Sequence, residues 1–315
     1  MSRGARSETA NLKMTITLPS FAKINWTLEV LGKRPDGYHE LRTLLQTLSV
    51  GDELTFESIE RGIELHSTHP ELPLDESNLI HRAARALAEF TGCTKGVRVT
   101  INKQLPMAAG LGGGSSNAAV TLLALLKLWD LQIEPRDLFR LGAQLGADVP
   151  FFFIGGTCLG VGRGDEVYPT EEIEAEHLLL VNAGIAVPTR EVYGNLPPEL
   201  TKPGAVTNIP ASLWAAYDAM SNRQAPSGTF STVLHNDLEA PVLTRHPLLA
   251  EIKQRLLANG ARGALMSGSG STVFALFDSE AARSAAQQDL HAEGWWCAPA
   301  RTLNRREYRR ALQLT

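Results

Sequence analysis

The sequence predicts an α+β fold with two domains. Strand-like and helix-like stretches both recur along the chain, but without the regular strand–helix alternation of a doubly wound parallel sheet. A length of 315 residues suits two domains or one large one. Because the composition turns polar near residues 160–170, we expect a polar extension over residues 1–13, an N-terminal domain over 14–165 and a C-terminal domain over 166–315.

The first part of the chain is expected to combine short strands with helices. Four stretches with alternating or dense apolar residues are predicted as strands: residues 14–18, 24–31, 53–58 and 97–101. Three stretches rich in Ala and Leu are predicted as helices: residues 78–91, 115–131 and 135–145. Pro19 is expected to end the first strand and Gly92 the first helix. Pro135 and Gly146 flank the third helix in the positions typical of a helix start and a helix end.

The later part continues the same mixture. Four further apolar stretches are predicted as strands: residues 151–154, 157–161, 178–181 and 272–277. Helices are predicted over 248–258 and 279–292, the second being the last clear helix. The glycine cluster at 160–164 is expected to form a tight loop. Residues 203–230, which carry Pro, Ala and Ser, are interpreted as an insert.

Charge and composition disfavour several classes of protein. The formal net charge is -4, whereas nucleic-acid binding usually requires a basic surface. The three cysteines are far apart without a CxxC pair, so neither a disulfide framework nor a zinc site is indicated. No apolar run approaches the roughly 18 to 20 residues that span a bilayer, and no signal-peptide core is visible. We therefore expect a cytoplasmic protein with no nucleic-acid or membrane partner, of undetermined oligomeric state.

The strongest chemical signal lies in residues 106–119. Four glycines in five positions, Gly110 and Gly112–Gly114, leave a turn whose backbone N–H groups are free to converge on an anion. Ser115, Ser116 and Asn117 then open a helix, which adds hydroxyl groups and the positive end of the helix dipole. The triphosphate of a nucleotide is the natural ligand for such a loop, and a purely structural glycine turn is the alternative.

Two well-known phosphate motifs do not fit this loop. A P-loop requires G-x-x-x-x-G-K-[ST], and no lysine stands at that position. The dinucleotide fingerprint G-x-G-x-x-G fails at its last position, because Ser115 occupies the place of the third glycine. A dehydrogenase is therefore disfavoured.

Four segments together form a recognisable set: AKINWTLEVLGKRPDGYHEL, PMAAGLGGGSSNAA, GADVPFF and MSGSGSTVFAL. They resemble the galactokinase, homoserine kinase, mevalonate kinase and phosphomevalonate kinase (GHMP) superfamily, from about residue 14 to beyond residue 277. The AKIN and RPDGYHEL motifs narrow the resemblance to the family that uses ATP to phosphorylate the 2-hydroxyl of 4-diphosphocytidyl-2-C-methyl-D-erythritol in the non-mevalonate isoprenoid pathway. The resemblance implies a ribosomal-protein-S5-like N-terminal domain and a ferredoxin-like α/β-plait C-terminal domain.

The resemblance also implies ATP and Mg²⁺ as cofactors. It assigns eleven consecutive residues to ATP binding: Pro106, Met107, Ala108, Ala109, Gly110, Leu111, Gly112, Gly113, Gly114, Ser115 and Ser116. No acidic Mg²⁺ ligand stands out, so the metal ligands stay unassigned. The chain departs from the family pattern at Phe21, where proline is usual, and at Ala108 and Ala109, where the loop is often richer in glycine.

The catalytic pair implied by the resemblance is Lys23 and Asp148. Asp148 would accept the proton of the substrate hydroxyl, and Lys23 would activate or orient that hydroxyl. Local sequence alone favours plainer roles, because an aspartate after a helix is usually a turn residue and a lone lysine in an apolar strand is usually exposed.

Six further residues are implied to bind the small-molecule substrate: Asn25, Tyr38, His39, Lys103, Thr189 and Tyr193. Tyr38 and Tyr193 would sandwich the cytosine ring, while His39 would select cytosine by hydrogen bonds to the base edge. Asn25, Lys103 and Thr189 would contact hydroxyls or phosphates, and Lys103 is placed where it could touch either ligand.

Three other functions remain open. A kinase of the same superfamily acting on homoserine or mevalonate is disfavoured by Tyr38, His39 and Lys103. A catalytically silent nucleotide-binding regulator is disfavoured because Lys23 and Asp148 are both retained. An RNA-binding module on the same fold is disfavoured by the negative net charge.

Overall fold

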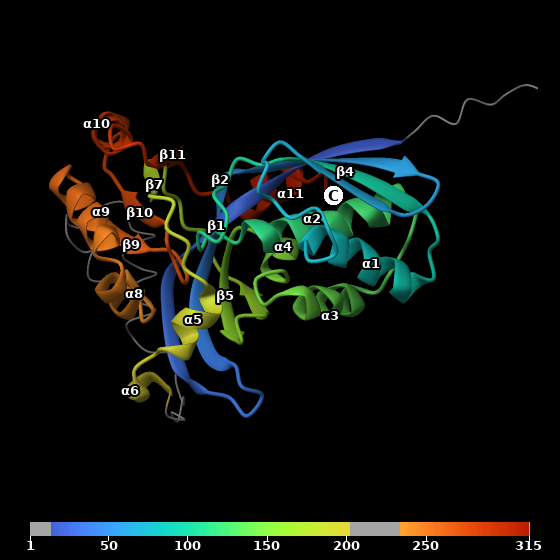
Figure 1. The fold of residues 1–315 in the computed structure, drawn as a ribbon, viewed down its shortest axis with the longest axis horizontal. Coiled ribbons are helices and arrows are strands. Elements are labelled where there is room, and N and C mark those ends of the chain that lie inside the picture. The colour runs from blue at the N-terminus through green and yellow to red at the C-terminus, as the bar shows by residue number, and fades with distance from the viewer. Residues whose placement is uncertain (1–13, 202–233, 315) are drawn as a thin grey trace, which may run out of the picture.

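The computed structural model describes residues 14–201 and 234–314. The predicted extension over 1–13 and the predicted insert over 203–230 therefore lie outside the described residues. Two β-sheets, one of seven strands and one of four, are accompanied by helices (Figure 1). This confirms the predicted α+β class.

The seven-stranded sheet is built around two long antiparallel strands. Its order is β3-β4-β2-β1-β8, and β5 and β6 continue it from β2. The strands span Thr15–Lys33 (β1), His39–Ile59 (β2), Ile63–Ser67 (β3), Gly96–Asn102 (β4), Thr157–Gly162 (β5), Glu166–Pro169 (β6) and His235–Asn236 (β8). The expected stop at Pro19 is wrong, since β1 runs through it. β8 pairs with β1 only at Thr27 and Leu28, so Pro19 lies where β1 has one partner strand, a position that tolerates proline.

Four helices cover one face of this sheet (Figure 1). They span Leu79–Thr91 (α1), Gly113–Leu128 (α2), Pro135–Leu145 (α3) and Phe151–Ile154 (α4). Helix α1 starts where the Asn78 side chain accepts the Ile80 N–H and ends at Gly92 with a φ of +69°. Helix α3 starts at Pro135 and ends before Gly146, which confirms both predicted helices.

The predicted strand over 151–154 is wrong, because these residues form helix α4. Pro150 already has helical dihedrals, and Gly155 ends the turn with a φ of +69°. Phe151, Phe152 and Phe153 are all buried there. A four-residue apolar run has no detectable period, so its sequence fits a buried strand and a buried helical turn equally well.

The glycine cluster at 160–164 is also more regular than expected. Strand β5 runs through Gly160 to Gly162, and a turn at residues 163–165 leads into β6, which pairs antiparallel with β5. The tight reversal is therefore shorter than the predicted loop and belongs to a hairpin.

The second sheet is antiparallel throughout, in the order β11-β7-β10-β9. Its strands span Leu178–Asn182 (β7), Gly263–Met266 (β9), Val273–Leu276 (β10) and Trp296–Ala300 (β11). The other helices span Thr189–Gly194 (α5), Pro198–Thr201 (α6), Glu239–Arg245 (α8), Pro247–Ala258 (α9) and Glu280–His291 (α10). The predicted strands at 178–181 and 272–277 and the predicted helices at 248–258 and 279–292 are confirmed, whereas β9, β11, α5, α6 and α8 were not predicted. No helix among the described residues is long and apolar enough to cross a membrane.

A last helix, Arg305–Ala311 (α11), was not predicted and returns to the first sheet (Figure 1). Asn304 and Glu307 form a capping box at its start. Its Tyr308 is fully buried in the same core cluster as α2 and α4. The end of the predicted C-terminal domain therefore completes the core of the N-terminal one.

Candidate active site

A cavity of about 1310 Å³ collects most of the residues that the sequence singled out. Its lining includes these predicted residues: Lys23, Asn25, Tyr38, His39, Lys103, Pro106, Ala108, Ala109, Gly110, Leu111, Gly112, Gly113, Gly114, Ser115, Asp148, Thr189 and Tyr193. Met107 and Ser116 do not line it. Residues distant in the sequence thus meet around one space.

The glycine loop crosses this cavity in a conformation that requires glycine. Gly110 has a φ of +75°, and a Cβ there would overlap the Ser267 carbonyl oxygen. Gly112 has a φ of +67°, and a Cβ there would lie 2.8 Å from Cγ of Lys23. Helix α2 begins directly after Gly112. Since the first N–H groups of a helix lack partners within it, this end of α2 is suited to an anion.

The polar residues that follow the loop divide into two groups. Ser115 lines the cavity, but Ser116 and Asn117 are buried. Ser20 Oγ donates to Asn117 Oδ1 at 2.5 Å and shares a hydroxyl hydrogen bond of 2.8 Å with Ser116 Oγ. The side chains of Ser116 and Asn117 therefore fix α2 to β1 and are not available as ligands to the cavity.

Asp52 fixes the base of the loop and was missed by sequence reasoning. It is 2% exposed and accepts hydrogen bonds from Lys103 Nζ at 2.9 and 3.0 Å. It also accepts from the backbone N–H groups of Gln104 and Leu105, both at 2.9 Å, and from Asn117 Nδ2 at 3.3 Å. Burial lowers the pKa of Lys103 despite the opposing effect of Asp52. Lys103 is thus held by the carboxylate of Asp52. Sequence reasoning missed Asp52 because a lone Gly-Asp between two strand-like stretches does not indicate a buried ion pair.

Lys23 and Asp148 come together at the cavity. Lys23 Nζ lies 3.6 Å from Asp148 Oδ2, with side chains 4% and 35% exposed. The register of β1 against β2 shifts between Phe21 and Lys23, and such irregularities redirect side chains. Lys23 Nζ also donates to Asn25 Oδ1 at 2.8 Å. The lysine is therefore a buried, oriented cation beside a carboxylate that remains accessible.

The two predicted tyrosines line the cavity in different ways. Tyr38 is 57% exposed, and the Arg163 guanidinium lies 4.9 Å from its ring centroid. Tyr193 stacks on His39 with centroids 5.2 Å apart. Burial, with a smaller effect of Asp148, raises the pKa of Tyr193. Arg163 was not predicted, because an arginine in a glycine-rich turn carries no specific signal.

His39 is a nearly buried imidazole with an unused polar atom. It is 9% exposed, and its Nε2 has no hydrogen-bond partner among the described residues. Burial, assisted by the charge of Lys33, lowers the pKa of His39 below its usual 6.5. The neutral ring therefore carries a donor or acceptor that no described residue uses.

A second glycine-serine turn, residues 267–271, holds the first loop from the other sheet. Ser267 Oγ donates to the Gly110 carbonyl at 2.9 Å, and the Thr272 N–H donates to the Ala109 carbonyl at 3.1 Å. Thr189 and Ser269 share a hydroxyl hydrogen bond of 2.8 Å at the same edge. Both sheets thus contribute to the cavity.

Comparisons with known proteins match this arrangement. The model of the GHMP kinases N terminal domain matches residues 78–156, and that of the GHMP kinases C terminal matches 213–294. A protein of Syntrophus aciditrophicus named 4-diphosphocytidyl-2-C-methyl-D-erythritol kinase is 45% identical, over 87% of this chain and 94% of its own. One of the same name from Citrifermentans bemidjiense is 44% identical, over 90% and 97%. The chain belongs to the 4-diphosphocytidyl-2-C-methyl-D-erythritol kinase family.

Solved structures agree with this membership. A crystal structure of 4-(cytidine 5'-diphospho)-2C-methyl-D-erythritol kinase superposes with a TM-score of 0.76 at 35% identity, covering 92% of this chain and all of that one. Homoserine kinase from Cytophaga hutchinsonii gives a TM-score of 0.68 at 18% identity, over 96% and 99%, which shows the shared fold alone. This GHMP kinase is therefore a small-molecule kinase with ATP as its co-substrate.

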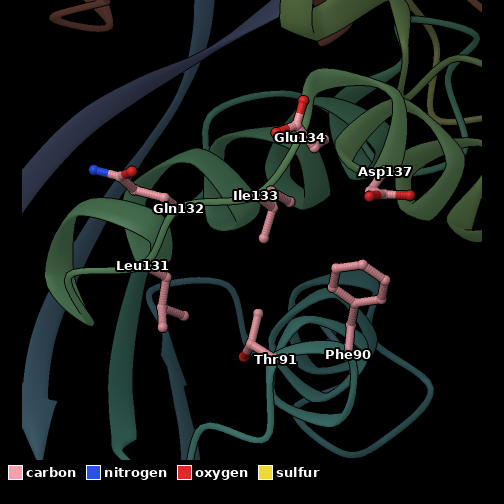
Figure 2. A pocket seen from close by; sticks show the side chains of 7 residues that line it. All are labelled: Phe90, Thr91, Leu131, Gln132, Ile133, Glu134 and Asp137. Atoms are coloured by element: carbon pink, nitrogen blue, oxygen red, sulfur yellow. The ribbon is translucent and has the colours of Figure 1, made fainter.

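A second, smaller cleft of this GHMP kinase carries none of the predicted site residues. Figure 2 shows it between the end of α1, at Phe90 and Thr91, and the segment from Leu131 to Asp137. Its volume is about 520 Å³, and its lining holds two carboxylates and no cationic side chain. Such a lining offers nothing to neutralise a triphosphate, so this smaller cleft does not suit ATP.

Proposed function

We propose that this kinase transfers the γ-phosphoryl group of ATP to the 2-hydroxyl of 4-diphosphocytidyl-2-C-methyl-D-erythritol, giving the 2-phosphate and ADP. The observation that carries the proposal is the Lys23–Asp148 pair, whose Nζ and Oδ2 atoms lie 3.6 Å apart beside the glycine loop. The substrate is proposed from the names of the relatives at 45% and 44% identity.

Asp148 acts as the general base in this proposal. The oxygen of the substrate hydroxyl forms a bond to the γ-phosphorus while the bond from phosphorus to the bridging oxygen of ADP breaks, and the hydroxyl proton passes to Asp148. Lys23 is held by Asn25 at 2.8 Å, so its ammonium group is fixed in place before substrate binds. A fixed cation orients the hydroxyl and stabilises developing negative charge.

The glycine loop binds the phosphates of ATP through backbone N–H groups and the N-terminal end of α2. Hydrogen bonds on two sides of the loop support this role. Asp52 accepts from the backbone just before the loop, and Ser267 donates to the Gly110 carbonyl. Lys103 contributes through Asp52 to the shape of the loop. A loop fixed on both sides loses little freedom when the nucleotide binds.

Mg²⁺ fits this site as a companion of the phosphates. Among the residues that the structure describes, no group of three or more His, Cys, Asp and Glu side chains could hold a metal ion. Mg²⁺ usually keeps several waters and binds one or two carboxylates together with substrate phosphates. Asp148 is the carboxylate of the catalytic pair that would be available to it. When bound, the ion would neutralise phosphate charge.

Recognition of the cytidine part is proposed for the part of the cavity lined by Tyr38, His39 and Tyr193. Tyr38 exposes more than half of its surface, so one ring face is available for stacking on a base. His39 brings its unpartnered Nε2 to the same region, next to Tyr193. Asn25 and Thr189 offer polar atoms for hydroxyls or phosphates of the substrate.

The test is ADP release from the purified protein with MgATP and each candidate alcohol. We expect release with 4-diphosphocytidyl-2-C-methyl-D-erythritol and none above background with homoserine or mevalonate. Release with either of those alcohols would replace the proposed substrate. If the protein is folded and binds ATP, but none of the tested alcohols stimulates ADP release, the proposed catalytic activity is contradicted.

The role of Asp148 is tested by Asp148→Asn, which keeps the shape of the side chain and removes the base. We expect kcat to fall about 10² to 10⁴-fold, the usual contribution of a general base, with little change in the KM for ATP. Asp278→Asn, on an exposed carboxylate outside the cavity, is the control and should retain kcat. Near-normal turnover by Asp148→Asn would exclude the proposed base.

A further inference from the structure

The C-terminal segment from Leu303 to Leu312 lies behind the two elements that carry Lys23 and Asp148. These two residues are 125 positions apart in the sequence, and among the described residues no backbone hydrogen bond joins β1 to the turn at residues 146–150. The segments that flank Lys23 and Asp148 are instead connected by one residue of the first sheet, Thr47 on β2, and one residue of α11, Tyr308.

Thr47 is the partner of Lys23 in the register of β1 and β2. Its N–H donates to the Gly156 carbonyl at 3.1 Å, and its Oγ1 accepts the Gly156 N–H at 3.0 Å. Leu303 binds the same residue from the C-terminal segment: its N–H donates to the Thr47 carbonyl at 2.9 Å, and its carbonyl accepts Thr47 Oγ1 at 3.1 Å. Thr47 is fully buried, so these bonds are shielded from water.

Tyr308 makes the second connection with its side chain. Its hydroxyl donates to the Phe152 carbonyl at 2.5 Å, within the helix that starts three residues after Asp148. Its ring occupies the space beside Gly155, where a Cβ would overlap it. The same ring lies 5.8 Å from that of Phe21, two residues before Lys23. One fully buried side chain thus contacts the flanks of both halves of the pair.

We propose that Tyr308 is a positioning residue that sets the separation of Lys23 and Asp148, with Thr47 as its counterpart in the sheet. This inference rests on the proposed function, because it assumes that the pair carries the reaction. Helix α4 is only one turn long and follows the Asp148 turn directly, so any shift of its buried phenylalanines would also move that turn. The Tyr308 hydroxyl and ring supply a fixed point at its end.

The primary test is Tyr308→Phe, which removes the hydroxyl and keeps the ring. We expect kcat to fall about tenfold, because a displacement of the pair by a fraction of an ångström is costly in catalysis, while the KM values for ATP and for the alcohol change less than twofold. Trp129→Phe is the matched control. Trp129 is buried in the same core cluster and likewise donates to one backbone carbonyl, that of Gly96 at 3.3 Å, but Gly96 begins β4 and does not flank Lys23 or Asp148.

A double-mutant cycle with Asp148→Asn separates positioning from general loss of stability. If Tyr308 acts through Asp148, adding Tyr308→Phe to Asp148→Asn lowers the residual kcat less than twofold. An equal fold-loss in both backgrounds, or an equal loss in Trp129→Phe, overturns the positioning role. If Asp148→Asn alone keeps a near-normal kcat, both the proposed general base and this inference are contradicted. If Asp148→Asn lowers kcat but Tyr308→Phe does not, only this inference is contradicted.

Thr47 keeps the proposal testable if Tyr308→Phe does not fold. Thr47→Val removes the hydroxyl that links Gly156 to Leu303, and Thr47→Ser restores it. We expect Thr47→Val to lower kcat about tenfold at unchanged KM and Thr47→Ser to recover most of the loss. A Thr47→Val enzyme with wild-type kcat would count against the connection.

Discussion

Buried ionisable side chains are the residues on which the candidate site depends. Lys23, Asp52 and Lys103 are each at most 5% exposed, and a charge removed from water is tolerated only with a partner. Lys23 has Asn25 and Asp148, while Lys103 and Asp52 have each other. The first of these groups faces the cavity, and the second supports the loop that crosses it.

Asp52→Asn should destabilise the protein strongly, because it leaves the Lys103 ammonium buried without a countercharge. We expect the free energy of unfolding to fall by about 3 to 5 kcal/mol, the usual effect of breaking a buried ion pair from one side. Urea denaturation measures it. The double variant Asp52→Asn/Lys103→Met removes both charges and should be more stable than Asp52→Asn alone. A double variant that is less stable would show that the backbone hydrogen bonds, and not the charge, dominate.

His39 should make stability depend on pH. Its pKa is lowered in the folded state by burial and by Lys33, so the unfolded chain binds the proton more readily. Stability is therefore fully present above the unfolded pKa of about 6.5 and is lost as pH falls through the window below it. We expect the Tm of the wild type to drop more than that of His39→Gln between pH 7 and pH 5. Parallel curves for the two proteins would mean that His39 does not contribute.

At the scale of elements, strong local signals predicted structure well, whereas one short apolar run was assigned to the wrong class. Helices α1 and α3 were predicted because Gly92, Pro135 and Gly146 mark their ends. The helix at Phe151–Ile154 was predicted as a strand, since four apolar residues carry no period. Helix α11 was missed because most of its side chains are charged and only Tyr308 among them is buried. Its role depends on what it packs against, which local sequence does not contain.

The glycine loop is the element whose conformation is most tightly constrained, and Gly110→Ala tests it. Gly184→Ala is the control, since both glycines have a φ of +75° but a Cβ at Gly184 would meet nothing within 4 Å. The control should cost only backbone strain, about 1 kcal/mol. Gly110→Ala must also displace the Ser267 carbonyl, so we expect a larger loss of stability and a KM for ATP raised about tenfold or more. Equal effects of the two variants on the KM would show that the contact with Ser267 does not shape the nucleotide site.

At the scale of the whole molecule, the two sheets share both the site and the core. The second sheet supplies the turn that holds Gly110, and α11 fills the core of the first. The sequence motifs identified the cavity-lining residues Lys23 and Asp148 because resemblance carries information about distant contacts. Asp52 and Tyr308 lie outside those motifs, and their importance comes from partners more than 50 and 150 residues away. Such contacts are visible only once the chain is folded.

The return of α11 predicts that the first sheet does not form a stable domain without the C-terminus. A chain ending at Thr302 lacks Tyr308 and Leu312, which are 0% and 1% exposed in the core of the first sheet. Removing one large buried side chain typically costs about 2 to 5 kcal/mol, and domains are stable by only about 5 to 15 kcal/mol. We therefore expect the truncated chain to lose its cooperative thermal transition, or to melt far below the full chain, in calorimetry.

The control is the double variant Arg306→Ala/Arg309→Ala, which changes two residues on the exposed side of the same helix. It should melt within a few degrees of the wild type. A truncated chain that melts like the wild type would show that the core of the first sheet is complete without α11.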